Sequence, residues 1–183
     1  MKTATLYFHS SCFDGLVSAV LAWAFIENRG QLRIGQLLPV DYSVRDTWIS
    51  MRLNGPSAIV DFLYHPRAFF WADHHLSSFI TPNAKQNFLS RERTACLWYD
   101  ELAPSCAAVI WQRSNRCFRG SDRVRLEEMI HWANKVDSAA YGSPHEAIFK
   151  GCVFSPSGSH YSVLDITLDS PTGHVTRTGF VSG

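Results

Sequence analysis

The sequence lacks both the charge imbalance and the long apolar runs that mark nucleic-acid-coating or membrane-spanning proteins. Its formal net charge is +1 at pH 7. No global field therefore attracts nucleic acid or an anionic membrane, and any preference for phosphate must come from a local site. The apolar run over residues 16–26 stops at Glu27 and is too short to cross a bilayer. We expect no membrane contact.

Cysteine patterns that would indicate redox or structural metal chemistry are also missing. The five cysteines, at positions 12, 96, 106, 117 and 152, include no C-x-x-C pair. Without a closed Cys/His quartet, a structural zinc protein is not expected. Their odd number fits a reducing compartment better than secretion. A strand-like run follows Met1 and Lys2 directly, without the pattern of a signal peptide. These absences predict a cytoplasmic location.

What is present is the composition of a folded globular domain. Hydrophobic residues make up 46% of the 183 residues and charged residues 18%, which favours one domain with a substantial core. Strand patterns over residues 3–9 and 32–40 flank a helical stripe over 15–27, which is typical of a βαβ unit. Further strands are predicted at 57–62 and 68–72, a short helix at 46–53, and helices at 105–113 and 121–135.

This alternation predicts an α/β fold, a layered parallel sheet with helices on both faces. We expect residues 1–150 to form the domain. The segment 151–183 is rich in Ser, Gly, Thr and Pro, and it forms either a short hairpin or a loose tail in this interpretation.

Residues that can bind a metal follow three of the predicted strands. Because parallel strands end at the same edge of a sheet, these side chains are expected to meet there. An acidic residue after the helix 121–135 is a fourth candidate, since a carboxylate at a helix C-terminus needs a compensating cation. The candidates are His9, Cys12, Asp14, Asp61, Asp73, His74, His75 and Asp137.

Taken singly, these residues have structural explanations as well. Asp14 could be the N-cap of the helix that follows it. His9 could be a hydrogen-bonded histidine at a strand end, and Asp73-His74-His75 could be a polar turn. Asp61 is harder to explain, because a carboxylate among apolar neighbours needs a partner. Their joint occurrence at successive strand ends favours a metal site.

The ordered set of an HSSCFDG loop at residues 9–15, then Asp61, then Asp73-His74-His75 resembles the DHH phosphoesterase superfamily. The resemblance spans roughly residues 3–140. It implies that His9 binds one metal and that Asp14 and His74 bind a second, with Asp61 bridging the two. It also implies a later acidic ligand at Asp137.

The same resemblance assigns the chemistry to the Asp-His-His triplet and to the metals. His75 would face the scissile phosphate, and Asp73 would orient a histidine. Two divalent ions are implied, Mn²⁺ first, with Mg²⁺, Zn²⁺ and Fe²⁺ as alternatives. Cys12 stands where the family usually has an aspartate, so a thiolate would replace a carboxylate there.

The function implied is hydrolysis of a phosphoester or phosphoanhydride by water activated at the metals. The expected substrate is a phosphorylated small molecule or short nucleic acid, most plausibly a nucleotide or small oligonucleotide. The alternative is a catalytically weakened metal- or nucleotide-binding module. The roughly thirty residues after Gly151 cannot hold the family's usual substrate-binding domain. Either the chain is a minimal or truncated member of that family, or a homo-oligomer or a partner subunit supplies that surface.

Overall fold

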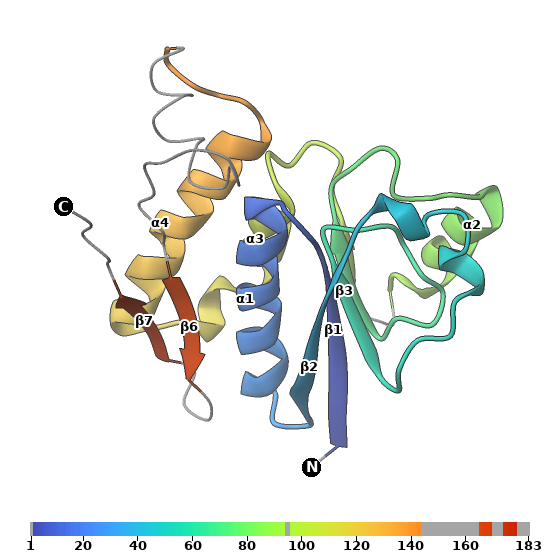
Figure 1. Ribbon diagram of the computed structural model, residues 1–183, viewed down its shortest axis with the longest axis horizontal. Helices are drawn as coiled ribbons and strands as arrows, with labels where there is room; N and C mark the ends of the chain where they lie inside the picture. Colours follow the sequence, from blue (N-terminus) through green and yellow to red (C-terminus); the bar gives the residue numbers. More distant parts are fainter. Residues whose placement is uncertain (1, 94–95, 144–164, 170–173, 179–183) are drawn as a thin grey trace.

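A parallel sheet of five strands forms the centre of the protein (Figure 1). The computed structural model describes residues 2–93, 96–143, 165–169 and 174–178. The strands lie in the order β2-β1-β3-β4-β5, and each neighbouring pair is parallel. Their bounds are β1 Lys2–His9, β2 Leu32–Val40, β3 Ser57–Val60, β4 Phe70–Asp73 and β5 Cys96–Tyr99. The expected layered α/β fold is confirmed.

The first three elements form the predicted βαβ unit. Helix α1 (Phe13–Asn28) follows β1 and buries an apolar face that includes Val17, Leu21 and Phe25. The helix stops where Gly30 takes a positive φ of 69°, which glycine adopts without steric cost. Strand β2 then returns alongside β1. This unit fixes the start of α1 beside the end of β1.

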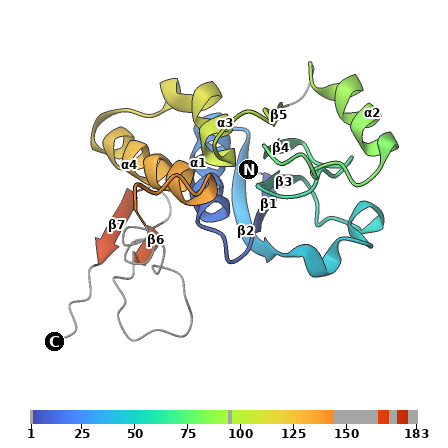
Figure 2. The same ribbon diagram turned by 90° about the horizontal axis from the view of Figure 1, so that it is seen from above.

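Helices cover both faces of the sheet (Figure 2). One face carries α1 together with α3 (Cys106–Ser114) and α4 (Gly120–Asp137). The other face carries α2 (Pro82–Arg91) and the short 3₁₀ turns η1 (Tyr42–Val44) and η2 (Trp48–Ser50). A third 3₁₀ turn, η3 (Asn115–Cys117), joins α3 to α4.

The strands β3, β4 and β5 lie between two separate apolar cores. Val60, Phe70 and Ala72 face the core under α1, α3 and α4, whereas Ile59 and Trp71 face the core under α2. Because both faces are covered, β3 and β4 are buried at every position. The chain switches faces between β1 and β3, since α1 covers one side and the β2–β3 connection covers the other.

Three parts of the structure differ from the sequence prediction or add to it. Residues 46–53 contain the single turn η2 rather than a helix. The sequence analysis missed α2, although Thr81 caps it and Pro82 occupies its first turn. It also missed β5, whose four residues are too short to give a clear period.

Part of the 151–183 segment lies outside the described residues. In the described part of this segment, β6 (Asp165–Asp169) and β7 (His174–Thr178) pair antiparallel. This pairing corresponds to the hairpin alternative. Among the residues that the structure describes, no helix has the length and apolarity needed to span a bilayer.

Candidate metal centre

The loop after β1 holds three of the eight candidate residues in a fixed arrangement. Ser11 takes a left-handed backbone conformation with φ of 56°, and α1 begins at Phe13. Cys12 occupies the N-cap position of α1 but makes no side-chain capping hydrogen bond. The loop therefore leaves the Cys12 thiol and the His9 imidazole at the carboxyl edge of the sheet, where β1, β3 and β4 end.

Asp14 caps a helix, but not the helix that the sequence suggested. It lies within α1, and its carboxylate accepts hydrogen bonds from the backbone N–H groups of Cys106 (2.6 Å) and Ala107 (2.9 Å) at the start of α3. The interpretation of Asp14 as the N-cap of its own helix is therefore wrong. Ser105 caps α3 as well, through the N–H of Ala108. A carboxylate has further lone pairs, so this role leaves Asp14 able to bind a cation.

Asp61 is the most strained and least satisfied residue of the group. It follows β3 directly, is fully buried, and has a φ of 54°, a conformation that non-glycine residues adopt rarely. Neither carboxylate oxygen has a hydrogen bond. Burial, followed by the negative charges of Asp14 and Asp73, raises the pKa of Asp61 well above its usual range. A buried carboxylate of this kind is stabilised only by a positive partner.

His9 and Cys12 supply the nearest donors to Asp61 on one side. The register of β1 with β3 pairs Phe8 with Val60, so His9 and Asp61 leave the sheet side by side. Nδ1 of His9 lies 3.5 Å from Oδ2 of Asp61 and has no hydrogen bond. Burial, then the Asp61 charge, raises the pKa of the Cys12 thiol to about 12. A cation among these three donors would reverse that effect, because positive charge favours the thiolate.

Asp73 organises the turn that carries the two histidines. Its Oδ1 accepts hydrogen bonds from the N–H of His74 (2.8 Å) and from Nδ1 of His75 (2.8 Å), and its Oδ2 accepts one from the Ser78 hydroxyl (2.5 Å). The hydrogen bond to Asp73, the largest of several effects, raises the pKa of His75. Asp73 therefore fixes the His75 ring with its Nδ1 engaged, which leaves Nε2 for another partner.

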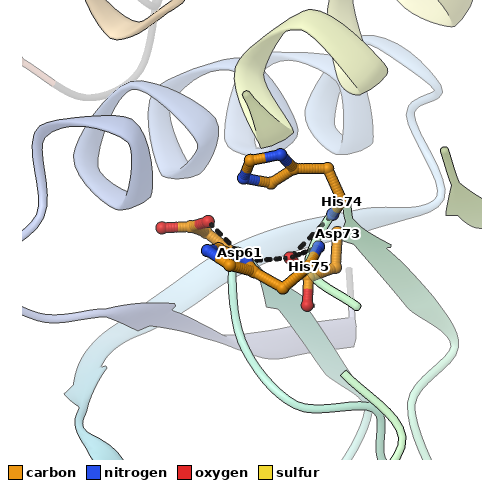
Figure 3. A group of neighbouring side chains, drawn as sticks. All are labelled: Asp61, Asp73, His74 and His75. Atoms are coloured by element: carbon orange, nitrogen blue, oxygen red, sulfur yellow. Dashed lines mark hydrogen bonds and ion pairs between the residues drawn. The ribbon is translucent and has the colours of Figure 1, made fainter. Parts of the chain in front are cut away.

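His74 points toward α1 and α4, and its ring centroid lies 4.3 Å from that of His75 (Figure 3). Its Nδ1 lies 3.0 Å from the carbonyl oxygen of Ala103, which assigns the proton to Nδ1. Its Nε2 lies 3.1 Å from Oδ2 of Asp137 and 3.7 Å from Oδ2 of Asp14. Burial lowers the pKa of His74, but the two carboxylates outweigh it and raise it to about 9. A proton on Nε2 thus takes the position that a cation would occupy.

All eight candidate residues come together at the carboxyl edge in three overlapping groups. Within each group, one donor atom per residue lies within 4.8 Å of every other. Asp61 and His74 each belong to two groups, so the groups adjoin, and Figure 3 shows the group that contains both of them. The groups are His9–Cys12–Asp61, Asp14–His74–Asp137 and Asp61–Asp73–His74–His75. This edge therefore carries clusters of acidic, imidazole and thiol groups that could hold a metal ion.

The donor set fits divalent cations on two counts. Oxygen and imidazole donors suit first-row metals, and the thiol adds affinity for the softer ones. In addition, four of the five buried side-chain atoms without a hydrogen bond, among the described residues, belong to these groups. They are His9 Nδ1, both oxygens of Asp61 and His74 Nε2. Polar atoms that are buried and unpartnered at one place favour an ion there.

Sequence reasoning missed the groups that support these donors. Ser78 and the carbonyl of Ala103 fix Asp73 and His74, and the start of α3 fixes Asp14. Only Ser78 had a sequence signal, its position shortly after the triplet. A backbone carbonyl such as that of Ala103 carries no side-chain signature, so only the fold can place it.

Comparisons of the chain with protein-family models, with curated proteins and with solved structures gave no match.

Gly15 offers a test of how tightly this centre is built. A Cβ at this position would lie 2.3 Å from the carbonyl oxygen of His9 and 3.1 Å from Oδ2 of Asp61. We expect Gly15→Ala to lower the free energy of unfolding by about 1–3 kcal/mol through overpacking, and to weaken Mn²⁺ binding because His9 and Asp61 must shift. Denaturant unfolding and calorimetric Mn²⁺ titration measure the two effects.

Gly30→Ala is the matched control for this substitution. Gly30 has open space around its Cβ position and a φ of 69°, so alanine there costs about 1–2 kcal/mol by backbone strain and leaves Mn²⁺ affinity unchanged. Wild-type Mn²⁺ affinity in Gly15→Ala would contradict the close approach of the three backbone segments.

Proposed function

We propose that this protein is a divalent-metal-dependent phosphoesterase of the DHH type. The observation that carries the proposal is Asp61, a fully buried carboxylate without hydrogen bonds that lies between the His9–Cys12 side and the His74–His75 side of the site. Such a residue is costly unless cations face it. Asp61 lies at the carboxyl end of β3, next to β1, where the connections change from one face of the sheet to the other. Open parallel sheets bind ligands at this point.

The ligand assignment follows the donor groups. His9, Cys12 and Asp61 would hold one cation, and Asp14, His74 and Asp137 would hold a second. Asp61, which also shares a group with His74, would bridge the two. Mn²⁺ is the first choice for the pair. When bound, such a pair supplies positive charge to the phosphate oxygens and activates water for an in-line displacement.

The Asp-His-His triplet provides the other part of the reaction. His75 has its Nδ1 hydrogen bonded to Asp73, and its side chain is 31% exposed, so its Nε2 can reach a bound phosphate. The raised pKa favours the protonated ring, which donates a hydrogen bond from Nε2 or passes that proton to the leaving oxygen. Asp73 acts through His75, as a positioning residue. The substrates proposed are phosphoesters or phosphoanhydrides of nucleotides or short oligonucleotides.

Metal content and hydrolysis test this proposal together. After dialysis against EDTA the protein is expected to show no hydrolysis of bis(p-nitrophenyl) phosphate, and addition of Mn²⁺ is expected to start it. Elemental analysis gives the number of ions bound. Mn²⁺ binding without hydrolysis of this ester or of a dinucleotide would favour the alternative, a metal- or nucleotide-binding module. Absence of Mn²⁺ binding would contradict the phosphoesterase proposal and leave only the nucleotide-binding form of the alternative.

The Cys12 thiol predicts a spectroscopic signal of its own. If its sulfur binds a metal in the His9–Cys12–Asp61 group, Co²⁺ loading is expected to produce a near-ultraviolet sulfur-to-metal charge-transfer band. The Cys12→Asp variant should bind Co²⁺ without that band. Cys117→Ser is the matched control, because Cys117 is exposed on η3 and outside the donor groups, and it should keep the band. An unchanged spectrum in Cys12→Asp would remove Cys12 from the ligands.

A further inference from the structure

Exposed apolar side chains gather around the metal centre. Among the described residues, five large hydrophobic side chains are exposed, and three of these follow strands at the carboxyl edge. They are Tyr42 after β2 (41% exposed), Leu76 after β4 (81%) and Leu102 after β5 (89%). Leu89 and Val124, the other two, lie on α2 and α4. Scattered exposed leucines are ordinary, but a set bordering a buried polar centre indicates a ligand with an apolar part.

Tyr42 is the member of this set whose ring is held in place beside the donors. Its ring centroid lies 5.2 Å from that of His9, edge to face at 75°, and 5.4 Å from that of Phe62 at 45°. The Ser77 side chain, two residues after His75, lies close enough to the Tyr42 hydroxyl to oppose the rise that burial causes in its pKa. The ring therefore lies next to His9, between the loop after β2 and the turn after β4. Even so, 41% of the residue is exposed to solvent.

A ring fixed in this way suits one kind of neighbour. Tyrosine presents a large planar surface with few rotatable bonds, so a second flat ring stacks on it at small entropic cost. Inorganic pyrophosphate or a sugar phosphate carries only polar groups, which gain nothing from Tyr42 and Leu76. A nucleotide carries a base close to its phosphate, and base stacking on an aromatic side chain is tolerant of base identity.

We infer that Tyr42, whose ring lies next to His9 at the edge of the metal centre, forms the platform on which the base of a nucleotide substrate stacks while its phosphate lies at the metal centre. This inference rests on the proposed function and names its substrate class. Tyr42 is then a specificity-determining residue that favours nucleotides over other phosphate esters without choosing among the bases.

The test compares two phosphomonoesters that differ in the base alone, AMP and ribose 5-phosphate. Their dissociation constants are measured by calorimetry on the Mn²⁺-loaded full chain. The wild type is expected to bind AMP about tenfold more tightly, in the range given by one stacked base. Tyr42→Leu keeps an apolar side chain but loses the ring, and should reduce that preference to near unity. Tyr42→Trp should retain it.

Leu89→Ala is the control, since Leu89 is an exposed leucine on α2 outside the donor groups, and it should bind like the wild type. Equal affinity for the two compounds in the wild type, or a preference that survives in Tyr42→Leu, would overturn the platform. Failure of both compounds to bind would overturn the platform and the phosphoesterase proposal together. A Tyr42-dependent preference for AMP without hydrolysis of any phosphoester would support the platform and contradict the phosphoesterase proposal alone.

Discussion

Replacing Asp61 with asparagine is expected to abolish hydrolysis and metal binding while making the metal-free protein more stable. Asparagine keeps the size of the side chain and tolerates the left-handed backbone at φ of 54° better than most residues. It removes a buried charge that has no hydrogen bond. We expect the free energy of unfolding of the metal-free protein to rise by about 1–3 kcal/mol, because the amide stays polar but removes the charge that burial penalises.

Hydrolysis should fall on the order of a thousandfold or more, because loss of metal stabilisation removes several kcal/mol from the transition state. Asp61→Ala should be equally inactive, with little loss of folding. Asp46→Asn is the matched control, since Asp46 is an exposed aspartate on the loop before η2. Turnover near the wild-type rate in Asp61→Asn, or a clear loss of stability, would contradict the role given to this carboxylate.

Mn²⁺ is expected to raise the melting temperature of the wild type, and EDTA to reverse the rise. An ion at about a hundred times its dissociation constant stabilises the folded state by about 2.7 kcal/mol for each site. For a chain of this length that corresponds to roughly 5–11 °C. The physical reason is the set of buried atoms on His9 and Asp61 that have no hydrogen bond, which the cation would contact when it binds.

Differential scanning calorimetry with EDTA, Mg²⁺ and Mn²⁺ measures this shift. The same scans on Asp61→Asn should show a much smaller rise, because that variant lacks the shared ligand. A melting temperature that Mn²⁺ leaves unchanged in the wild type would mean that the unpartnered atoms are not a cation site.

The sequence was most informative about features that depend on residues close together in the chain. The start of α1 and the residues at the ends of β1 and β4 follow from patterns within about a dozen positions, because strand and helix periods are local. The predicted meeting of His9, Asp61 and His74 needed only the rule that parallel strands end at one edge. The layered fold and the juxtaposition of the seven candidates that follow strands come from these two arguments, whereas Asp137 was added because it follows a helix C-terminus.

Other features depend on contacts between distant segments and could not be read from the chain. The carboxylate of Asp14 bonds the start of α3 rather than its own helix, since the packing of α1 against α3 decides which N–H groups are near. The positive φ of Asp61 follows from the turn that the chain makes after β3. Tyr42 gave no signal, because its importance comes from what surrounds its ring.

The Asp14–His74–Asp137 group joins the first helix, the middle of the sheet and the last residue of α4. During synthesis the amino-terminal half can form β1, α1 and β3, yet this group stays one donor short until α4 has left the ribosome. In the proposed function, a cation can therefore bind this group only after residue 137 has been made. A chain released earlier would lack Asp137 even if its sheet had folded.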